Sequence, residues 1–77
     1  MKWAVGESYL YLGQTFAADR RFDKALSSYA LAERTLRGIR MRWLVGYVYC
    51  AVTAVLLEKG DIDHAIKTVN KALSSAR

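Results

Sequence analysis

A segment of twelve residues recurs after forty residues, and this internal repeat restricts the possible folds more than any other feature of the chain. Residues 21–32 (RFDKALSSYALA) align with residues 61–72 (DIDHAIKTVNKA). Self-similarity at a fixed period of this size is typical of repeat architectures. In both copies a small alanine lets paired helices approach, and bulky residues before and after it fill the space on either side. The matched pairs are Phe22 with Ile62, Asp23 with Asp63, Ala25 with Ala65, Tyr29 with Val69, and Ala32 with Ala72.

Apolar residues fall at three- and four-residue steps along the whole chain, a spacing typical of α-helices. They predict an all-α fold of four helices, over residues 2–18, 22–36, 39–58 and 62–76. We expect Gly38 to end the second helix. We expect Gly60 to end the third helix, because glycine adopts the left-handed conformation without a Cβ clash. Asp61 is expected to cap the fourth helix.

The size and composition of the chain predict one small packed domain over residues 1–77. Seventy-seven residues cannot build two hydrophobic cores, and 53% hydrophobic residues with no proline exclude a disordered tail. The only cysteine, Cys50, cannot form an internal disulfide, which favours a reducing, cytoplasmic location. The longest apolar stretch, residues 43–57, is shorter than the roughly 20 residues that a membrane span needs. We therefore expect no membrane association.

The repeat resembles the tetratricopeptide repeat family, whose pattern places aromatic residues and Leu-Gly on a first helix and aromatic-Ala pairs on a second. The resemblance implies two antiparallel helix-turn-helix repeats, at about residues 6–39 and 46–77. Thr53 stands where the first helix of the second repeat would carry the glycine. The matching residues of the first repeat are Tyr9, Leu12, Gly13, Phe16, Phe22, Ala25, Tyr29 and Ala32. Those of the second are Tyr49, Val52, Leu56, Gly60, Ile62, Ala65, Val69 and Ala72.

Two features depart from that family's pattern. Arg20 stands where the family usually has a turn glycine, and a left-handed non-glycine residue costs on the order of 1 kcal/mol, which favours a reshaped turn. The forty-residue spacing also exceeds the family's usual thirty-four, so that residues 38–43 must lengthen the helices or the bend between repeats. Lengthened repeats of this kind resemble the helical effector and sensor domains of large bacterial transcriptional regulators.

The sequence offers no constellation for catalysis, metal binding or cofactor binding. His64 and Cys50 are the only residues of their types, so no Cys/His metal motif can be assembled within one chain. His64 lies in the first turn of its predicted helix beside Asp63 and is most simply a solvated residue. The five glycines are scattered singly and form no phosphate-binding loop. We therefore expect a protein that is not an enzyme, with no metal and no cofactor.

Four arginines at the bend between the repeats form a candidate anion-binding site. Their density could hold phosphates or a carboxylate, which makes a nucleic-acid or anionic-surface binder the alternative from another functional class. We favour a solvated turn, because Glu33 lies close and no sequence-reading motif for nucleic acid is present. The four residues are Arg34, Arg37, Arg40 and Arg42.

The family resemblance also implies a groove formed by the first helix of each repeat. The residues at these positions are mostly apolar, which suits the nonpolar face of a partner helix or peptide. Among the positions with which related repeats clamp a carboxylate tail, only Gln14 could serve, so that function is not carried over. The alternative is that these residues pack on neighbouring helices of the same assembly. The candidate partner-binding residues are Leu10, Gln14, Trp43, Tyr47, Cys50, Ala54 and Leu57.

Two repeats are few for a repeat protein, because each repeat buries its surface against the next. The chain therefore either self-associates as a homo-oligomer or belongs to a longer repeat array or regulator. We expect a second copy to cover the apolar surface around Trp43, Leu44 and Tyr47. The function predicted from the sequence is protein–protein interaction, with a foreign protein or peptide or with another copy of the chain.

Overall fold

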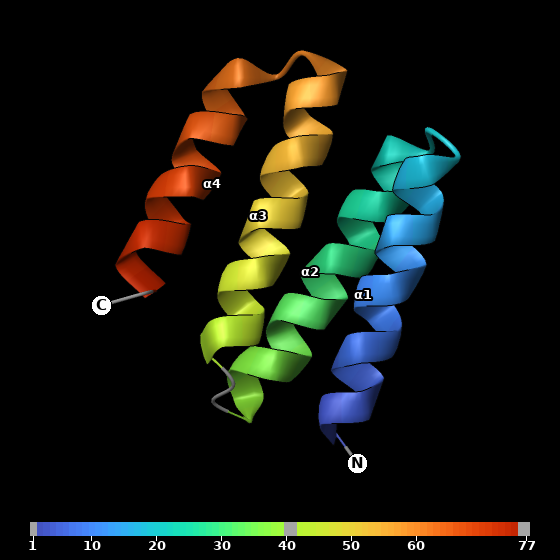
Figure 1. The fold of residues 1–77 in the computed structure, drawn as a ribbon, viewed down its shortest axis with the longest axis vertical. Coiled ribbons are helices and arrows are strands. Elements are labelled where there is room, and N and C mark those ends of the chain that lie inside the picture. The colour runs from blue at the N-terminus through green and yellow to red at the C-terminus, as the bar shows by residue number, and fades with distance from the viewer. Residues whose placement is uncertain (1, 40–41, 76–77) are drawn as a thin grey trace.

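The protein is all-α over the residues that the computed structural model describes, which are 2–39 and 42–75. Four helices follow one another: α1 (Lys2–Ala18), α2 (Phe22–Gly38), α3 (Arg42–Lys59) and α4 (Ile62–Ser75). They lie side by side in the order α1, α2, α3, α4, and each runs antiparallel to the one before it (Figure 1). The Cα atoms extend over 34 × 28 × 12 Å, so every helix has one side near the surface. At residues 2, 3, 42 and 75 only the backbone is described.

The helix boundaries predicted from the sequence are close to those observed, with two exceptions at the central bend. The second helix continues through Gly38 and is followed by Ile39, whose N–H donates to the Leu36 carbonyl oxygen at 3.3 Å. Gly38 is therefore the last residue of the helix, as predicted, although the helix runs two residues past Leu36. The third helix begins at Arg42, three residues later than Ile39, where the sequence predicted it to begin.

The turns inside the two hairpins, α1–α2 and α3–α4, share one hydrogen-bond pattern forty residues apart. Arg20 (φ 59°) and Gly60 (φ 85°) are both left-handed. The N–H of each donates to the carbonyl three residues back, at 3.0 and 3.1 Å. The following N–H donates to the carbonyl five residues back, at 2.8 and 2.9 Å. This is the Schellman ending of an α-helix, and it sets the angle at which the next helix departs.

The expectation that the first turn is reshaped around Arg20 is therefore wrong. Arg20 takes the strained left-handed conformation itself. Its guanidinium lies 5.6 Å from the centroid of the Phe22 ring, a cation–π contact that offsets part of the strain. The prediction for Gly60 is confirmed, since that residue ends α3 in the left-handed conformation.

Helices α1 and α2 are in close contact because α1 presents two glycines to large side chains of α2. A Cβ on Gly6 would lie 2.6 Å from Leu36 Cδ2, and a Cβ on Gly13 would lie 2.5 Å from Tyr29 Cε1. Neither position has room for a larger residue. On the α2 side, Ala25 is fully buried, as the sequence predicted for a close approach of helices.

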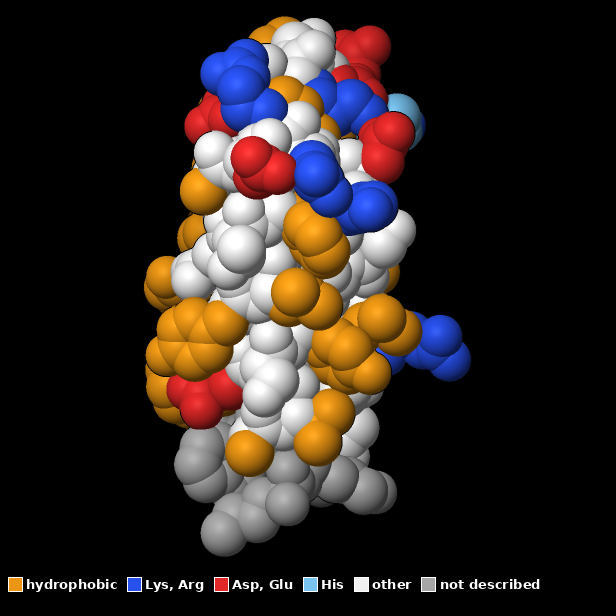
Figure 2. All heavy atoms as spheres, turned by 90° about the vertical axis from the view of Figure 1, so that its right-hand side faces the viewer, with side chains coloured by type: hydrophobic (Ala, Val, Ile, Leu, Met, Phe, Trp, Pro, Cys, Tyr) orange, Lys and Arg blue, Asp and Glu red, His pale blue; other side chains and the backbone are white. Residues whose placement is uncertain are grey.

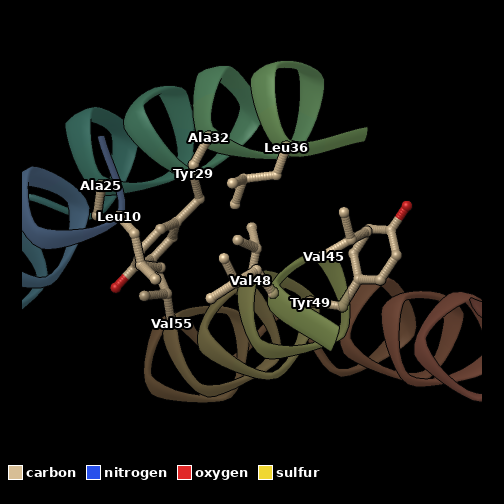
Figure 3. Packing of buried hydrophobic residues seen from close by; sticks show 10 residues of the cluster. Leu10, Ala25, Tyr29, Ala32, Leu36, Val45, Val48, Tyr49 and Val55 are labelled. Atoms are coloured by element: carbon tan, nitrogen blue, oxygen red, sulfur yellow. The ribbon is translucent and has the colours of Figure 1, made fainter. Parts of the chain in front are cut away.

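Helix α3 packs mainly on α2, touches α1 at fewer positions, and completes the core. Leu10 of α1 and Tyr29 and Leu36 of α2 point toward Val48 and Val55 of α3 (Figure 3). All five side chains are buried. Burying apolar surface is the main favourable term in folding, so this three-helix contact is the principal source of stability.

Polar contacts join α3 to α2 at two places. In the middle of α3, the Tyr49 hydroxyl donates to Glu33 Oε1 at 2.8 Å and accepts a hydrogen bond from Arg37. At the end of α3, Lys59 Nζ lies 3.3 Å from Asp23 Oδ1. The second pair is exposed and contributes little energy.

Helix α4 is the least covered element. Within the described part of the chain it packs on α3 alone and lies at one edge of the molecule (Figure 1). Ala65 is buried against α3, whereas Ile62, Ile66, Val69 and Leu73 are exposed. These four residues recur at steps of four, three and four, so they form one apolar stripe along the helix.

Candidate partner-binding groove

An apolar groove of about 450 Å³ runs between α3 and α4. The Thr53 hydroxyl donates to the Tyr49 carbonyl oxygen at 2.8 Å, so its one donor is used within its own helix. No charged side chain contributes to the lining that the structure describes. The surface of this groove is therefore suited to an apolar ligand. It is lined by Gly46, Cys50 and Thr53 of α3 and by Val69, Ala72 and Leu73 of α4.

Of the five partner-binding residues predicted on α3, only Cys50 lines this groove. Trp43, Tyr47, Ala54 and Leu57 are exposed, as is Cys50, which lines the groove. Their steps of four, three, four and three residues place them on one side of the helix. The structure thus brings five of the seven predicted residues together as one exposed apolar stripe.

The two predicted residues of α1 lie elsewhere. Leu10 is only 5% exposed and belongs to the core, so the prediction that it lines an open groove is wrong. The reason is that α3 covers the side of α1 that carries Leu10. Gln14 is half-buried, and its Nε2 donates to the Tyr47 hydroxyl at 3.2 Å. Gln14 therefore links α1 to α3 at the edge of the exposed stripe.

Leu44 also departs from the expectation drawn from the sequence. A second copy was expected to cover the surface around Trp43, Leu44 and Tyr47. Leu44 is buried in the core, whereas Trp43 and Tyr47 are exposed. These three residues therefore do not form one free surface, because α3 turns Leu44 toward the interior of the molecule.

Sequence reasoning missed the α4 wall of the groove, which Val69, Ala72 and Leu73 form. A signal for it is present in the repeat. Ile62, Ile66 and Val69 align with Phe22, Leu26 and Tyr29, and the latter residues pack into the core beneath α3. No further described helix covers α4. Its apolar residues at the matching positions therefore predict an exposed apolar face.

The candidate anion site at the bend is not assembled as the sequence suggested. Arg37 Nη2 lies 3.2 Å from Glu33 Oε1 and also contacts Tyr49, so its charge is already paired. Burial and the hydrogen bond to Glu33 raise the pKa of the Tyr49 hydroxyl, which keeps it a neutral donor. Arg34 is exposed. Arg40 and the side chain of Arg42 lie outside the described residues.

The only histidine is part of a helix cap. The His64 N–H lies 3.4 Å from Asp61 Oδ1, and His64 Nδ1 lies 2.5 Å from Asp61 Oδ2. The hydrogen bond from His64 lowers the pKa of the Asp61 carboxyl below its ordinary value. Asp61 therefore caps α4, as predicted from the sequence. Among the described side chains, no three His, Cys, Asp or Glu residues lie close enough together to hold a metal ion.

Comparison with protein families, with curated proteins and with solved structures found no match to this chain. No helix in the described ranges is long and apolar enough to cross a membrane.

Proposed function

We propose that the protein is a non-catalytic protein–protein interaction module of the tetratricopeptide type, which binds the apolar face of a partner helix in the groove between α3 and α4. The repeat assignment is supported by the equivalent turns at Arg20 and Gly60 and by the equivalent buried residues Ala25 and Ala65. The forty-residue spacing of both pairs is the same as that of the repeat in the sequence.

The apolar lining of the groove is the single observation that carries the proposed function. Hydrophobic side chains form the α4 wall and uncharged residues form the α3 wall, and Trp43, Tyr47 and Leu57 are further exposed apolar side chains of α3. Large exposed apolar surfaces are uncommon on proteins that act alone. An amphipathic helix is the ligand that such a groove suits best, because residues at three- and four-residue steps present one apolar face to it.

Binding of nucleic acid receives less support. Glu33 pairs with Arg37, and Glu33 also lies in the hollow that Arg37, Lys67 and Lys71 line. A carboxylate in such a hollow repels a phosphate and lowers its affinity.

A synthetic helical peptide tests the proposal, with Cys50 as the reporter. Cys50 lines the groove and its thiol is free, so its reaction with a chromogenic disulfide reagent reports on access to the groove. One peptide carries leucines at steps of three and four, and a second has the same composition in scrambled order. We expect only the first to slow the reaction of Cys50, by about fivefold or more at saturation.

Two lysine variants localise the effect. Leu73→Lys places a charge in the groove wall and should abolish the protection of Cys50. Leu31→Lys changes another exposed leucine, on α2 outside the groove, and should leave the protection intact. Equal reaction rates with both peptides, or protection that survives Leu73→Lys, would contradict the proposal.

A further inference from the structure

The chain contains its own example of a helix seated in a groove. Helix α3 covers the hollow between α1 and α2, mainly by packing on α2, and the two hairpins are related by the forty-residue repeat. The residues that line the α3–α4 groove lie forty positions after residues of the α1–α2 hollow. The groove is therefore the counterpart of the hollow that α3 covers. Gly46, Cys50 and Thr53 correspond to Gly6, Leu10 and Gly13; Val69, Ala72 and Leu73 correspond to Tyr29, Ala32 and Glu33.

If the two hollows correspond, residues of the α1–α2 hollow should be buried under α3, and their counterparts in the α3–α4 groove should be exposed. Leu10 lies beneath α3 and is buried, whereas its counterpart Cys50 is exposed. Tyr29 is 2% exposed, and its counterpart Val69 is 42% exposed. The α3–α4 groove is thus the same kind of hollow without its helix. A helix that resembles α3 on its packing face is the occupant that it fits.

Helix α1 resembles α3 in this respect, because it occupies the corresponding place in the first hairpin. The face of α3 that packs into the core includes Val45, which is 4% exposed. Its counterpart on α1, Val5, is 47% exposed. The counterparts of Val48, Val52 and Val55 are Ser8, Leu12 and Thr15, and all three are exposed.

This face of α1 can be buried without leaving polar atoms unsatisfied. The Ser8 hydroxyl donates to the Ala4 carbonyl oxygen at 2.8 Å, and the Thr15 hydroxyl donates to the Tyr11 carbonyl oxygen at 3.0 Å. Figure 2 views the molecule from the α1 side. Charged side chains gather at the end where the hairpin turns lie and at the edges, while apolar and uncharged atoms cover most of the middle.

We infer that α1 of a second copy of the chain binds in the α3–α4 groove and repeats the α2–α3 contact between molecules. The inference rests on the proposed function, since it names the partner of the same groove. The two contact surfaces are different parts of one chain, so the association is heterologous. Each added copy leaves one groove and one α1 face free, and the assembly is therefore open-ended.

One polar contact of the α2–α3 junction becomes a pair of like charges between copies. Lys59 pairs with Asp23 within the chain. The corresponding residues at the junction between copies are Asp19 and Asp63, which carry like charges. Asp19 lies 2.8 Å from Arg21, which reduces the repulsion. The variant Asp19→Lys restores an opposite-charge pair and should tighten association by about two- to fivefold at low salt.

Light scattering of the full chain at about 1 to 200 µM tests the inference. For the parent, we expect a weight-average mass that rises with concentration without a plateau at the dimer. The double variant Val5→Lys/Leu12→Lys blocks the α1 face, and Val69→Lys/Leu73→Lys blocks the groove. All four residues are exposed, so each variant should fold. Each variant alone should remain monomeric, because one of the two contact surfaces is blocked.

Mixing the two double variants is the decisive step. Each keeps the surface that the other lacks, so an equimolar mixture should form a dimer that does not grow further. Leu31→Lys changes an exposed leucine outside both surfaces and should associate like the parent. Circular dichroism of each variant confirms that it is helical before the masses are compared.

Three outcomes would overturn the inference. A parent that is monomeric throughout but still binds the leucine-patterned peptide refutes self-assembly and leaves the proposed function standing. A plateau at the dimer that Val5→Lys/Leu12→Lys does not disturb indicates a symmetric contact and excludes α1 as the ligand. A monomeric parent that also fails to bind the peptide refutes the inference and the proposed function together.

Discussion

The close approach of α1 and α2 predicts that alanine substitution has opposite effects at two glycines. At Gly13 a Cβ would lie 2.5 Å from Cε1 and 2.6 Å from Cδ1 of Tyr29, whereas an ordinary contact is 3.4–4 Å. The Tyr29 ring must therefore move by roughly 1 Å, although it is rigid and buried. Overpacking of this kind costs about 1–3 kcal/mol. The gain in helix propensity from glycine to alanine, about 1 kcal/mol, offsets only part of that cost.

Gly46 provides the matched control, because it is also inside a helix and a Cβ there would meet nothing within 4 Å. Gly46→Ala should stabilise the fold by about 0.5–1 kcal/mol, and Gly13→Ala should destabilise it by about 1 kcal/mol or more. Urea unfolding at low micromolar concentration, followed by circular dichroism, measures both. Each kcal/mol corresponds to about 4–8 °C in Tm for a domain of this size. If the two variants change stability equally, α1 and α2 are not in close contact at Gly13.

Other substitutions probe the helix contacts, the second turn and the cap of α4. Ala25→Leu and Ala65→Leu should each destabilise the fold by about 1–3 kcal/mol in chemical denaturation, because both alanines are buried where helices meet; unfolding at the parent midpoint would argue against the repeat alignment. Gly60→Ala should cost about 1 kcal/mol despite the open space around it, because φ is 85°, and an unchanged Tm would show that the turn can relax. Asp61→Ala should destabilise the protein above the ordinary carboxyl pKa of about 4, and the difference from the parent should shrink as the pH falls through the lowered pKa of Asp61. A difference that stays constant down to about pH 2 would show that the ionised carboxylate is not what stabilises the helix.

The sequence predicted the four helices and the close contact at Ala25, because both depend on local spacing and residue size. It also predicted the left-handed conformation of Gly60, since glycine adopts that conformation at no steric cost. The turn at Arg20 was not predicted. Its conformation is fixed by the hydrogen bonds that end α1 and by the cation–π contact with Phe22, and those contacts together outweigh a local preference.

The position of the groove depends on which helix covers which hollow, and a residue pattern along one helix does not contain that information. Leu10 and Cys50 occupy corresponding positions, and the sequence pattern predicted that both line an open groove. Only Leu10 is covered, because α3 lies on the first hairpin and no described helix lies on the second. The groove is therefore found between α3 and α4 instead of between the first helices of the two repeats.

A disulfide test between copies examines the central claim, that an α1 helix fits the α3–α4 groove. Thr15 corresponds to Val55, and Cys50 corresponds to Leu10, which points toward Val55 in the core (Figure 3). In a Thr15→Cys variant, the new thiol of one copy should lie near Cys50 of the next. Mild oxidation should then give a ladder of disulfide-linked chains on a non-reducing gel. Ser27→Cys, which adds an exposed thiol on α2 away from both surfaces, should give no more than a dimer band. Ladders of equal extent from the two variants, or none from Thr15→Cys, would contradict the claim.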